Sequence, residues 1–105
     1  MQRGEVYRLR SVKAVGHEQA GERYGVIVQA NELLPRSVVL VAPTSTSARA
    51  SWYRPVIELP DGSTRVMVEH MKSVDVSRLG YKMADLSLQE IWAVDEALLD
   101  VIGLR

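Results

Sequence analysis

The sequence has no cysteine, only two histidines and no long apolar run, and each of these absences excludes a class of protein. Without cysteine, the chain can form neither a disulfide nor a thiolate metal site. With His17 and His70 as the only imidazoles, a dedicated zinc site is not expected. No apolar run approaches the ~20 residues that a membrane helix needs, and the N-terminus lacks the apolar segment of a signal peptide. We therefore expect a cytoplasmic protein that enters no membrane and uses no metal or other cofactor.

The chain also lacks net charge. Thirteen basic and thirteen acidic side chains cancel, so no overall field attracts the protein to nucleic acid. The distribution is less even, because residues 1–60 carry +3 (eight basic, five acidic) and residues 61–105 carry −3 (five basic, eight acidic). A basic first half could serve a polyanion locally, although scattered surface charge explains the same counts.

A chain of 105 residues predicts a single domain, residues 1–105, with one modest core. Short apolar runs bounded by turn residues predict about six or seven strands. Pro55 places one strand at a sheet edge, since proline donates no ladder hydrogen bond. The unbroken apolar run at 38–42 is expected to be central. The expected strands cover residues 3–9, 24–30, 38–42, 52–59, 66–68 and 81–86, with a hairpin turn at 60–63 and residues 70–80 continuing the fifth strand into a turn.

The C-terminal segment predicts a helix. Ser87 and Glu90 have the spacing of a capping box, apolar residues follow at helical intervals, and Gly103 ends the pattern. Trp92 is expected to lie in the core. The predicted fold is mainly β with α, a small antiparallel β-barrel with a C-terminal α-helix.

Two polar segments adjoin buried strands. Residues 16–23 hold an imidazole, two carboxylates, an amide and a guanidinium before one strand, and residues 44–47 hold four hydroxyl groups after another. If these two strands are antiparallel neighbours, both segments lie at the same end, so that Arg23 and Thr44 converge. A guanidinium and a hydroxyl can together hold a phosphate. A solvated surface loop and local hydroxyl–backbone bonds explain the same residues without any function.

Several short motifs follow one another along nearly the whole chain. They are R-G-E-V-Y at 3–7, G-H-E-Q-A-G-E-R at 16–23, V-I-V-Q at 26–29, V-L-V-A-P-T-S-T at 39–46, V-E-H-M-K-S-V-D-V-S-R-L-G at 68–80, L-S-L-Q-E at 86–90, V-D-E-A-L at 94–98 and I-G-L at 102–104. In this order they resemble the MazF/PemK (Kid-like) toxins of bacterial type II toxin–antitoxin systems.

The resemblance implies a small SH3-like barrel of the CcdB/Kid type, a homodimer, and a metal-independent mRNA interferase. Such an enzyme cleaves single-stranded RNA at short sequences by attack of the 2′-OH on the adjacent phosphate. The products are a 2′,3′-cyclic phosphate and a 5′-OH end. The implied partner is a cognate, MazE-like antitoxin whose extended peptide occupies the RNA groove.

The resemblance implies two sets of catalytic residues. In one branch the arginine of the G-x-R motif matches Arg23, and a threonine after the V-x-x-P strand matches Thr44 or, counted from the proline, Ser45. In the Kid-like branch, the histidine of G-H-E-Q is the base and matches His17, and an acid matches Glu69.

Further residues of these motifs are expected to bind RNA, and some positions depart from the family pattern. Met67 stands where the Kid-like branch has an arginine, and Tyr24 replaces the usual proline. His70 replaces a glutamine and is either an RNA or dimer contact or a half-buried structural histidine. The residues expected to bind RNA are Glu18, Gln19, Ser45, Thr46 and Glu69.

Other roles stay open at this point. Trp52 and Tyr53 could stack on unpaired bases or pack as part of an edge strand. A non-enzymatic gyrase poison of CcdB type is an alternative function, although the end V-I-G-L-R lacks its expected tryptophan. A barrel that binds RNA or antitoxin without cleaving RNA is a third.

Overall fold

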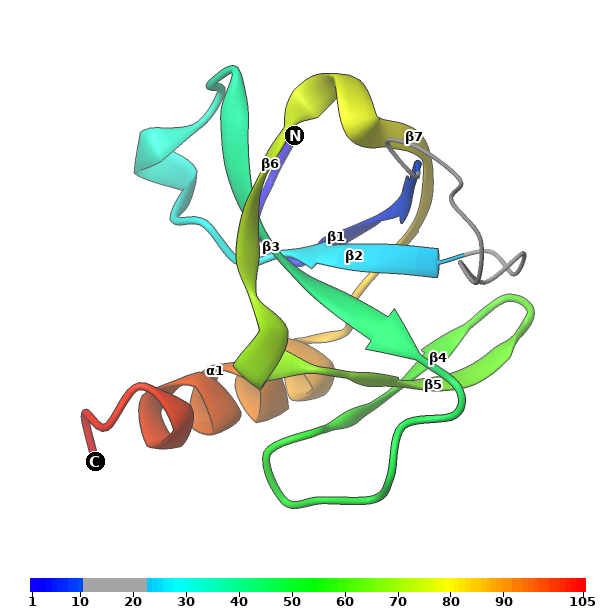
Figure 1. Cartoon of the computed structure of the whole chain (residues 1–105), viewed down its shortest axis with the longest axis vertical. Helices are drawn as coiled ribbons and strands as arrows, with labels where there is room; N and C mark the ends of the chain where they lie inside the picture. Colours follow the sequence, from blue (N-terminus) through cyan, green and yellow to red (C-terminus); the bar gives the residue numbers. More distant parts are fainter. Residues whose placement is uncertain (11–22) are drawn as a thin grey trace, which may run out of the picture.

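A computed structural model of the chain describes residues 1–10 and 23–105, which form a curled antiparallel sheet with one helix packed against it (Figure 1). Short 3₁₀ turns, η1 to η3, connect several of the strands. In chain order the elements are β1 (Glu5–Leu9), β2 (Arg23–Ile27), η1 (Asn31–Leu33), β3 (Val38–Ser45), β4 (Val56–Leu59), β5 (Gly62–Val66), η2 (Val68–His70), β6 (Lys72–Asp75), η3 (Val76–Arg78), β7 (Leu79–Asp85) and α1 (Leu88–Val101).

The sheet is organised around β3. The strand order is β4-β5-β3-β2-β1-β7, with β6 also paired to β3, and every pairing is antiparallel. β3 pairs with β6 along residues 38–41, with β2 along residues 41–43, and with β5 at residues 44 and 45. This confirms the predicted fold class, a mainly β antiparallel barrel-type fold with a C-terminal helix, with the sheet curled into a half-barrel, and it confirms the predicted central position of residues 38–42.

The core lies on both faces of the sheet, because neighbouring side chains of a strand point to opposite sides. Val26 of β2 packs in the larger cluster together with Val94 and Ala97 of α1. The next residue, Ile27, belongs to a second cluster with Val39 of β3. Burial on both faces explains why β2 and β3 appear in the sequence as continuous apolar runs rather than alternating ones.

The helix α1 begins and ends as predicted. The Ser87 hydroxyl accepts a hydrogen bond from the Glu90 amide, and the Glu90 carboxylate accepts one from the Ser87 amide. Gly103 follows with a φ of 76°, a conformation in which glycine is favoured. The prediction that Trp92 lies in the core is wrong, because Trp92 is 65% exposed. The helix buries Val94, and two residues of helical rotation turn Trp92 to the opposite side.

The strand after β3 begins later than predicted. The Ser51 carbonyl accepts a hydrogen bond from the Arg54 amide, which makes a turn, and Pro55 has no amide hydrogen to offer. β4 therefore starts at Val56, although its predicted place at the sheet edge is confirmed. The predicted hairpin between β4 and β5 is also confirmed, and Gly62 adopts a φ of 129° in its turn.

Residues 66–80 differ most from the prediction. The expected strand at 66–68 ends at Val66, and residues 70–80 do not continue it but run from the end of η2 through β6 and η3 into β7. The Asp75 side chain accepts a hydrogen bond from the Ser77 amide and so turns the chain into η3. The pairing of β6 with the distant β3, which no local pattern encodes, holds these residues in place.

Candidate functional site

A cavity of about 440 Å³ opens at the start of β2 and the end of β3. The start of β2, the end of β3 and the β4–β5 hairpin lie together on one side of the molecule, at the right of Figure 1. One wall comes from β2, β3 and the residues after β3, and the other comes from the hairpin. The lining residues are Arg23, Tyr24, Thr44, Ser45, Thr46, Ser47, Leu59, Asp61, Gly62, Ser63 and Thr64.

The pairing of β2 with β3 brings Arg23 and Thr44 to this cavity. Gly25 is paired with Pro43 in an antiparallel register, so Arg23 and Thr44 both lie at the same end of the two strands. Adjacent strands are about 4.8 Å apart, a separation that an arginine side chain easily spans. Arg23 and Thr44 therefore converge on one cavity as predicted, while residues 16–22 of the first polar segment lie outside the described residues. Thr44 itself lies within β3, paired with Val66, rather than in a loop after the strand.

The hydroxyl groups beside Thr44 differ in their surroundings. Thr44 is buried, with 3% of its surface exposed. The Ser45 hydroxyl lies 3.1 Å from the Ser47 hydroxyl and accepts a hydrogen bond from the Ser47 amide at 3.3 Å. Ser45 and Ser47 thus make the local turn bonds that such residues commonly make. Thr46 is exposed beside them and lines the cavity.

The hairpin wall adds polar groups that the sequence did not single out. The Tyr24 hydroxyl donates a hydrogen bond of 3.2 Å to Asp61 Oδ2, which ties the end of β2 to the hairpin. Thr64 is buried in the same wall, with 6% of its surface exposed. Their signal in the sequence is weak, because Asp61 reads there only as a turn residue before a glycine.

Three of the predicted site residues, His17, Glu18 and Gln19, lie outside the described residues. Their assignments as catalytic or RNA-binding residues remain predictions. Of the polar segment at residues 16–23, the structure describes Arg23.

Glu69 is placed away from the cavity lining. It lies in η2, where its Oε2 accepts hydrogen bonds from Arg54 Nε at 2.7 Å and Nη2 at 2.5 Å. Both side chains are about four-fifths buried, with 19% of Arg54 and 21% of Glu69 exposed. Arg54 could not be identified as a site residue from the sequence, because its partner Glu69 lies 15 residues away across a hairpin. A guanidinium therefore does accompany Glu69, although Met67 occupies the position where the family resemblance placed one.

The ion pair governs the protonation of Glu69. Burial raises the pKa of the Glu69 carboxyl, but the hydrogen bonds and charge of Arg54 outweigh it and leave the pKa below its ordinary value. Glu69 is consequently ionised at neutral pH and has no proton to donate. His70 Nε2 lies 3.8 Å from the same Oε2. The His70 side chain is 57% exposed, so it is more exposed than a half-buried structural histidine would be.

No three His, Cys, Asp or Glu side chains come together in the described part of the chain in a way that could hold a metal ion. No described helix has the length and apolar character needed to cross a membrane.

Comparison with known families decides where this fold and cavity belong. Residues 2–102 match the model of the PemK-like, MazF-like toxins of type II toxin–antitoxin systems. The chain belongs to this family. A Mycobacterium tuberculosis protein described as a candidate toxin is 36% identical to it over 104 residues, which cover 97% of each chain.

Solved structures share the MazF/PemK fold of this chain. The M. tuberculosis toxin MazF-mt6 superposes with a TM-score of 0.79 at 18% identity, covering 96% of this chain and 98% of the other. A mycobacterial endoribonuclease solved with its cognate antitoxin gives 0.78 at 20% identity, covering 100% and 97%. MazF of Deinococcus radiodurans gives 0.72 at 22% identity, covering 98% and 96%.

Proposed function

We propose that this MazF/PemK-family toxin is a sequence-specific endoribonuclease that cleaves single-stranded RNA without a metal ion. The observation that carries the proposal is the meeting of Arg23 and Thr44 in one cavity, where a phosphate has room to enter. The mycobacterial relative solved with its antitoxin is itself an endoribonuclease, which supports the same activity here.

The proposed reaction is an attack of the ribose 2′-oxygen on the neighbouring phosphorus. The O2′–P bond forms, the P–O5′ bond breaks, the 2′-OH gives its proton to a base, and the leaving O5′ takes up a proton. Arg23 holds two non-bridging phosphate oxygens and stabilises the negative charge that builds on them. The Thr44 hydroxyl donates to the same oxygens from the buried end of β3.

His17 is the proposed base, since an imidazole titrates near neutral pH and can accept the 2′-OH proton. Glu69 is a less suitable acid, because its pairing with Arg54 keeps it ionised. We propose instead that Glu69 acts indirectly, by holding the Arg54 side chain in position. Glu18, Gln19, Ser45 and Thr46 complete the proposed RNA contacts around the scissile phosphate.

The proposed partners follow from the same site. A cognate, MazE-like antitoxin peptide would occupy the cavity in place of RNA, and MazF of D. radiodurans, which shares this fold, is solved with MazE. We further propose that the toxin acts as a homodimer, and in the cytoplasm, where messenger RNA is found.

The test is incubation of the purified protein with a long single-stranded RNA in EDTA, followed by mapping of 5′-OH ends. We expect cuts at one short sequence. Arg23→Ala should lower the single-turnover rate by about 10²- to 10³-fold, the usual effect of losing one donor to a transition-state oxyanion. Arg36→Ala removes an exposed arginine whose Nε donates to Leu33 O outside the cavity, and should leave the rate unchanged.

Each failure has a distinct meaning. RNA that stays intact but is bound would favour a barrel that has lost catalysis, and gyrase-dependent DNA cleavage would favour the CcdB-like alternative. Cleavage that survives Arg23→Ala at full rate would contradict the proposed mechanism while leaving the activity in place.

A further inference from the structure

Trp52 is the feature of this molecule that its fold does not explain. It lies in the loop between β3 and β4 and is 71% exposed, although burial of an indole removes a large apolar area from water and is strongly stabilising. The Tyr53 ring lies nearly perpendicular to the indole, at an interplanar angle of 83° and a centroid distance of 5.3 Å. The indole is therefore in contact with Tyr53 and still accessible to a partner.

The loop that carries Trp52 is held in place by polar contacts. Arg54 pairs with Glu69, lies 5.5 Å from the centroid of the Tyr53 ring, and donates from Nη1 to the Arg49 carbonyl at 3.2 Å. Arg65 of β5 donates to the Arg54 carbonyl at 2.9 Å. Such bonds remove the conformational freedom that binding would otherwise have to remove. The ion pair between Arg54 and Glu69 thus presents Trp52 in a defined position.

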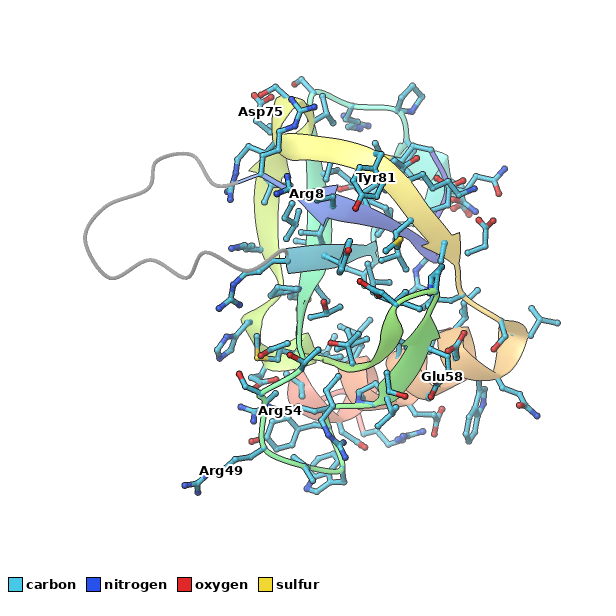
Figure 2. All side chains as sticks on the ribbon, turned by 90° about the vertical axis from the view of Figure 1, so that its right-hand side faces the viewer. Arg8, Arg49, Arg54, Glu58, Asp75 and Tyr81 are labelled. Atoms are coloured by element: carbon cyan, nitrogen blue, oxygen red, sulfur yellow. The ribbon has the colours of Figure 1, made fainter. Side chains whose placement is uncertain are left out.

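The same loop begins at the proposed cleavage site. Ser47 lines the cavity, and Trp52 lies five positions further along the chain, a span of at most about 18 Å of extended chain. Arg49 lies between them, is exposed, and extends away from the body of the protein (Figure 2). An aromatic ring beside cationic side chains is the arrangement that proteins use to hold single-stranded nucleic acid.

We propose that Trp52 is a stacking platform for an unpaired base of the RNA, a few nucleotides from the cleaved phosphate, with Arg49 at the backbone between them. The inference rests on the proposed ribonuclease function and adds a contact that helps select the RNA. A second copy of the chain is the competing occupant of this ring. RNA is favoured because arginines flank the ring and the loop is continuous with the cavity.

The chain offers its own matched control, since Trp92 is 65% exposed on α1 and lines no part of the cavity. In Trp92→Phe protein, Trp52 is the sole tryptophan and reports binding by its fluorescence. The probe is a 2′-O-methyl copy of the mapped RNA substrate, which has no 2′-OH and cannot be cleaved. We expect quenching of Trp52 fluorescence on titration, with the affinity of the unaltered protein.

Substitution then measures the contact. Trp52→Ala should weaken probe binding by about 5- to 150-fold, the range measured for loss of one base–aromatic stack. Trp52→Phe should retain part of the affinity, and Trp92→Ala should retain all of it. For cleavable RNA, Trp52→Ala should raise KM and leave kcat nearly unchanged, because stacking away from the phosphate binds ground and transition state alike.

A scan of abasic nucleotides along the RNA locates the base. The effect of Trp52→Ala should disappear when one particular base is missing and persist for the others. Unchanged affinity in Trp52→Ala protein that still cleaves RNA would overturn the platform and leave the ribonuclease function standing. A dimer that dissociates on Trp52→Ala would assign the ring to a contact between copies. An unaltered protein that neither binds nor cleaves RNA would overturn both proposals.

Discussion

Thr44 and Ser45 are neighbours on β3, yet their hydroxyl groups have different surroundings. The Ser45 hydroxyl is engaged with Ser47 in a local turn, and Thr44 is buried at the cavity. A group that already serves its own backbone is a poorer candidate for a phosphate contact than one built into a strand. At the scale of single residues, this difference favours Thr44 over Ser45 as the proposed phosphate contact, an assignment that residue counting left open.

Thr44→Val and Ser45→Ala test this separation. Thr44→Val removes the hydroxyl and keeps the shape of the side chain, so we expect a loss of about 10²-fold in single-turnover cleavage rate. Ser45→Ala should change the rate at saturating RNA by less than about threefold, since Ser45 is proposed as an RNA contact and not as a donor to the reacting phosphate oxygens. Equal losses in the two variants, measured on the same mapped RNA, would contradict the choice of Thr44.

The Arg54–Glu69 pair predicts a pH dependence of stability. The folded pKa of Glu69 lies below its ordinary value of 4.5, so the unfolded chain binds a proton that the folded chain does not. The pair therefore stabilises the fold fully above pH 4.5, and its contribution is lost as the pH falls through the lower, folded pKa.

A double-mutant cycle measures that contribution. The variants are Arg54→Met, Glu69→Gln and the double variant, each followed by urea unfolding at pH 7 and at several values below pH 4.5. We expect a stabilising coupling energy at pH 7 that declines towards zero in acid. A coupling energy independent of pH would show that the contact stabilises the loop by packing rather than by charge.

At the scale of elements, structure encoded by local signals could be predicted from the sequence, and structure that depends on long-range pairing could not. The capping box of α1 and the β4–β5 turn are encoded within a few residues, and both could be read directly from the sequence. The region from η2 to η3 could not, because β6 exists through its pairing with β3, more than thirty positions earlier. A periodicity window of ordinary length cannot contain both strands.

Ser87→Ala tests the capping box. It removes the acceptor for the Glu90 amide, and we expect a loss of about 1 kcal/mol in the free energy of unfolding. Ser73→Ala, at an exposed position of β6, is the matched control and should change stability by less than about 0.5 kcal/mol. Urea unfolding at pH 7 measures the free energy of unfolding of both variants. Equal losses in the two would show that the Ser87 cap does not stabilise the helix.

At the scale of the whole molecule, β3 joins the two apolar clusters into one unit. Ala42 belongs to the cluster under α1, while Val39 and Val41 belong to the cluster on the other face. The same strand ends at the cavity with Thr44. Damage to either cluster is therefore expected to reach both the fold and the site.

Val39→Ala and Val38→Ala form a matched pair on this strand. Val39 is fully buried and Val38 is 46% exposed. We expect Val39→Ala to cost about 2 kcal/mol of the free energy of unfolding and Val38→Ala less than about 1 kcal/mol. Circular dichroism and tryptophan fluorescence should report one shared transition in urea. Two separate transitions would show that the clusters unfold independently.

The sequence by itself determined the antiparallel architecture, the central strand, the helix with its cap, and the approach of Arg23 to Thr44 at the cavity. Each depends on periodicity or turn chemistry within a short stretch, which is why no contact needed to be known. The tertiary structure alone decided the partner of Glu69, the exposure of Trp52 and Trp92, and the path of residues 66–80. These depend on which surfaces meet across the sheet, and burial is a property of the packed chain rather than of any one residue.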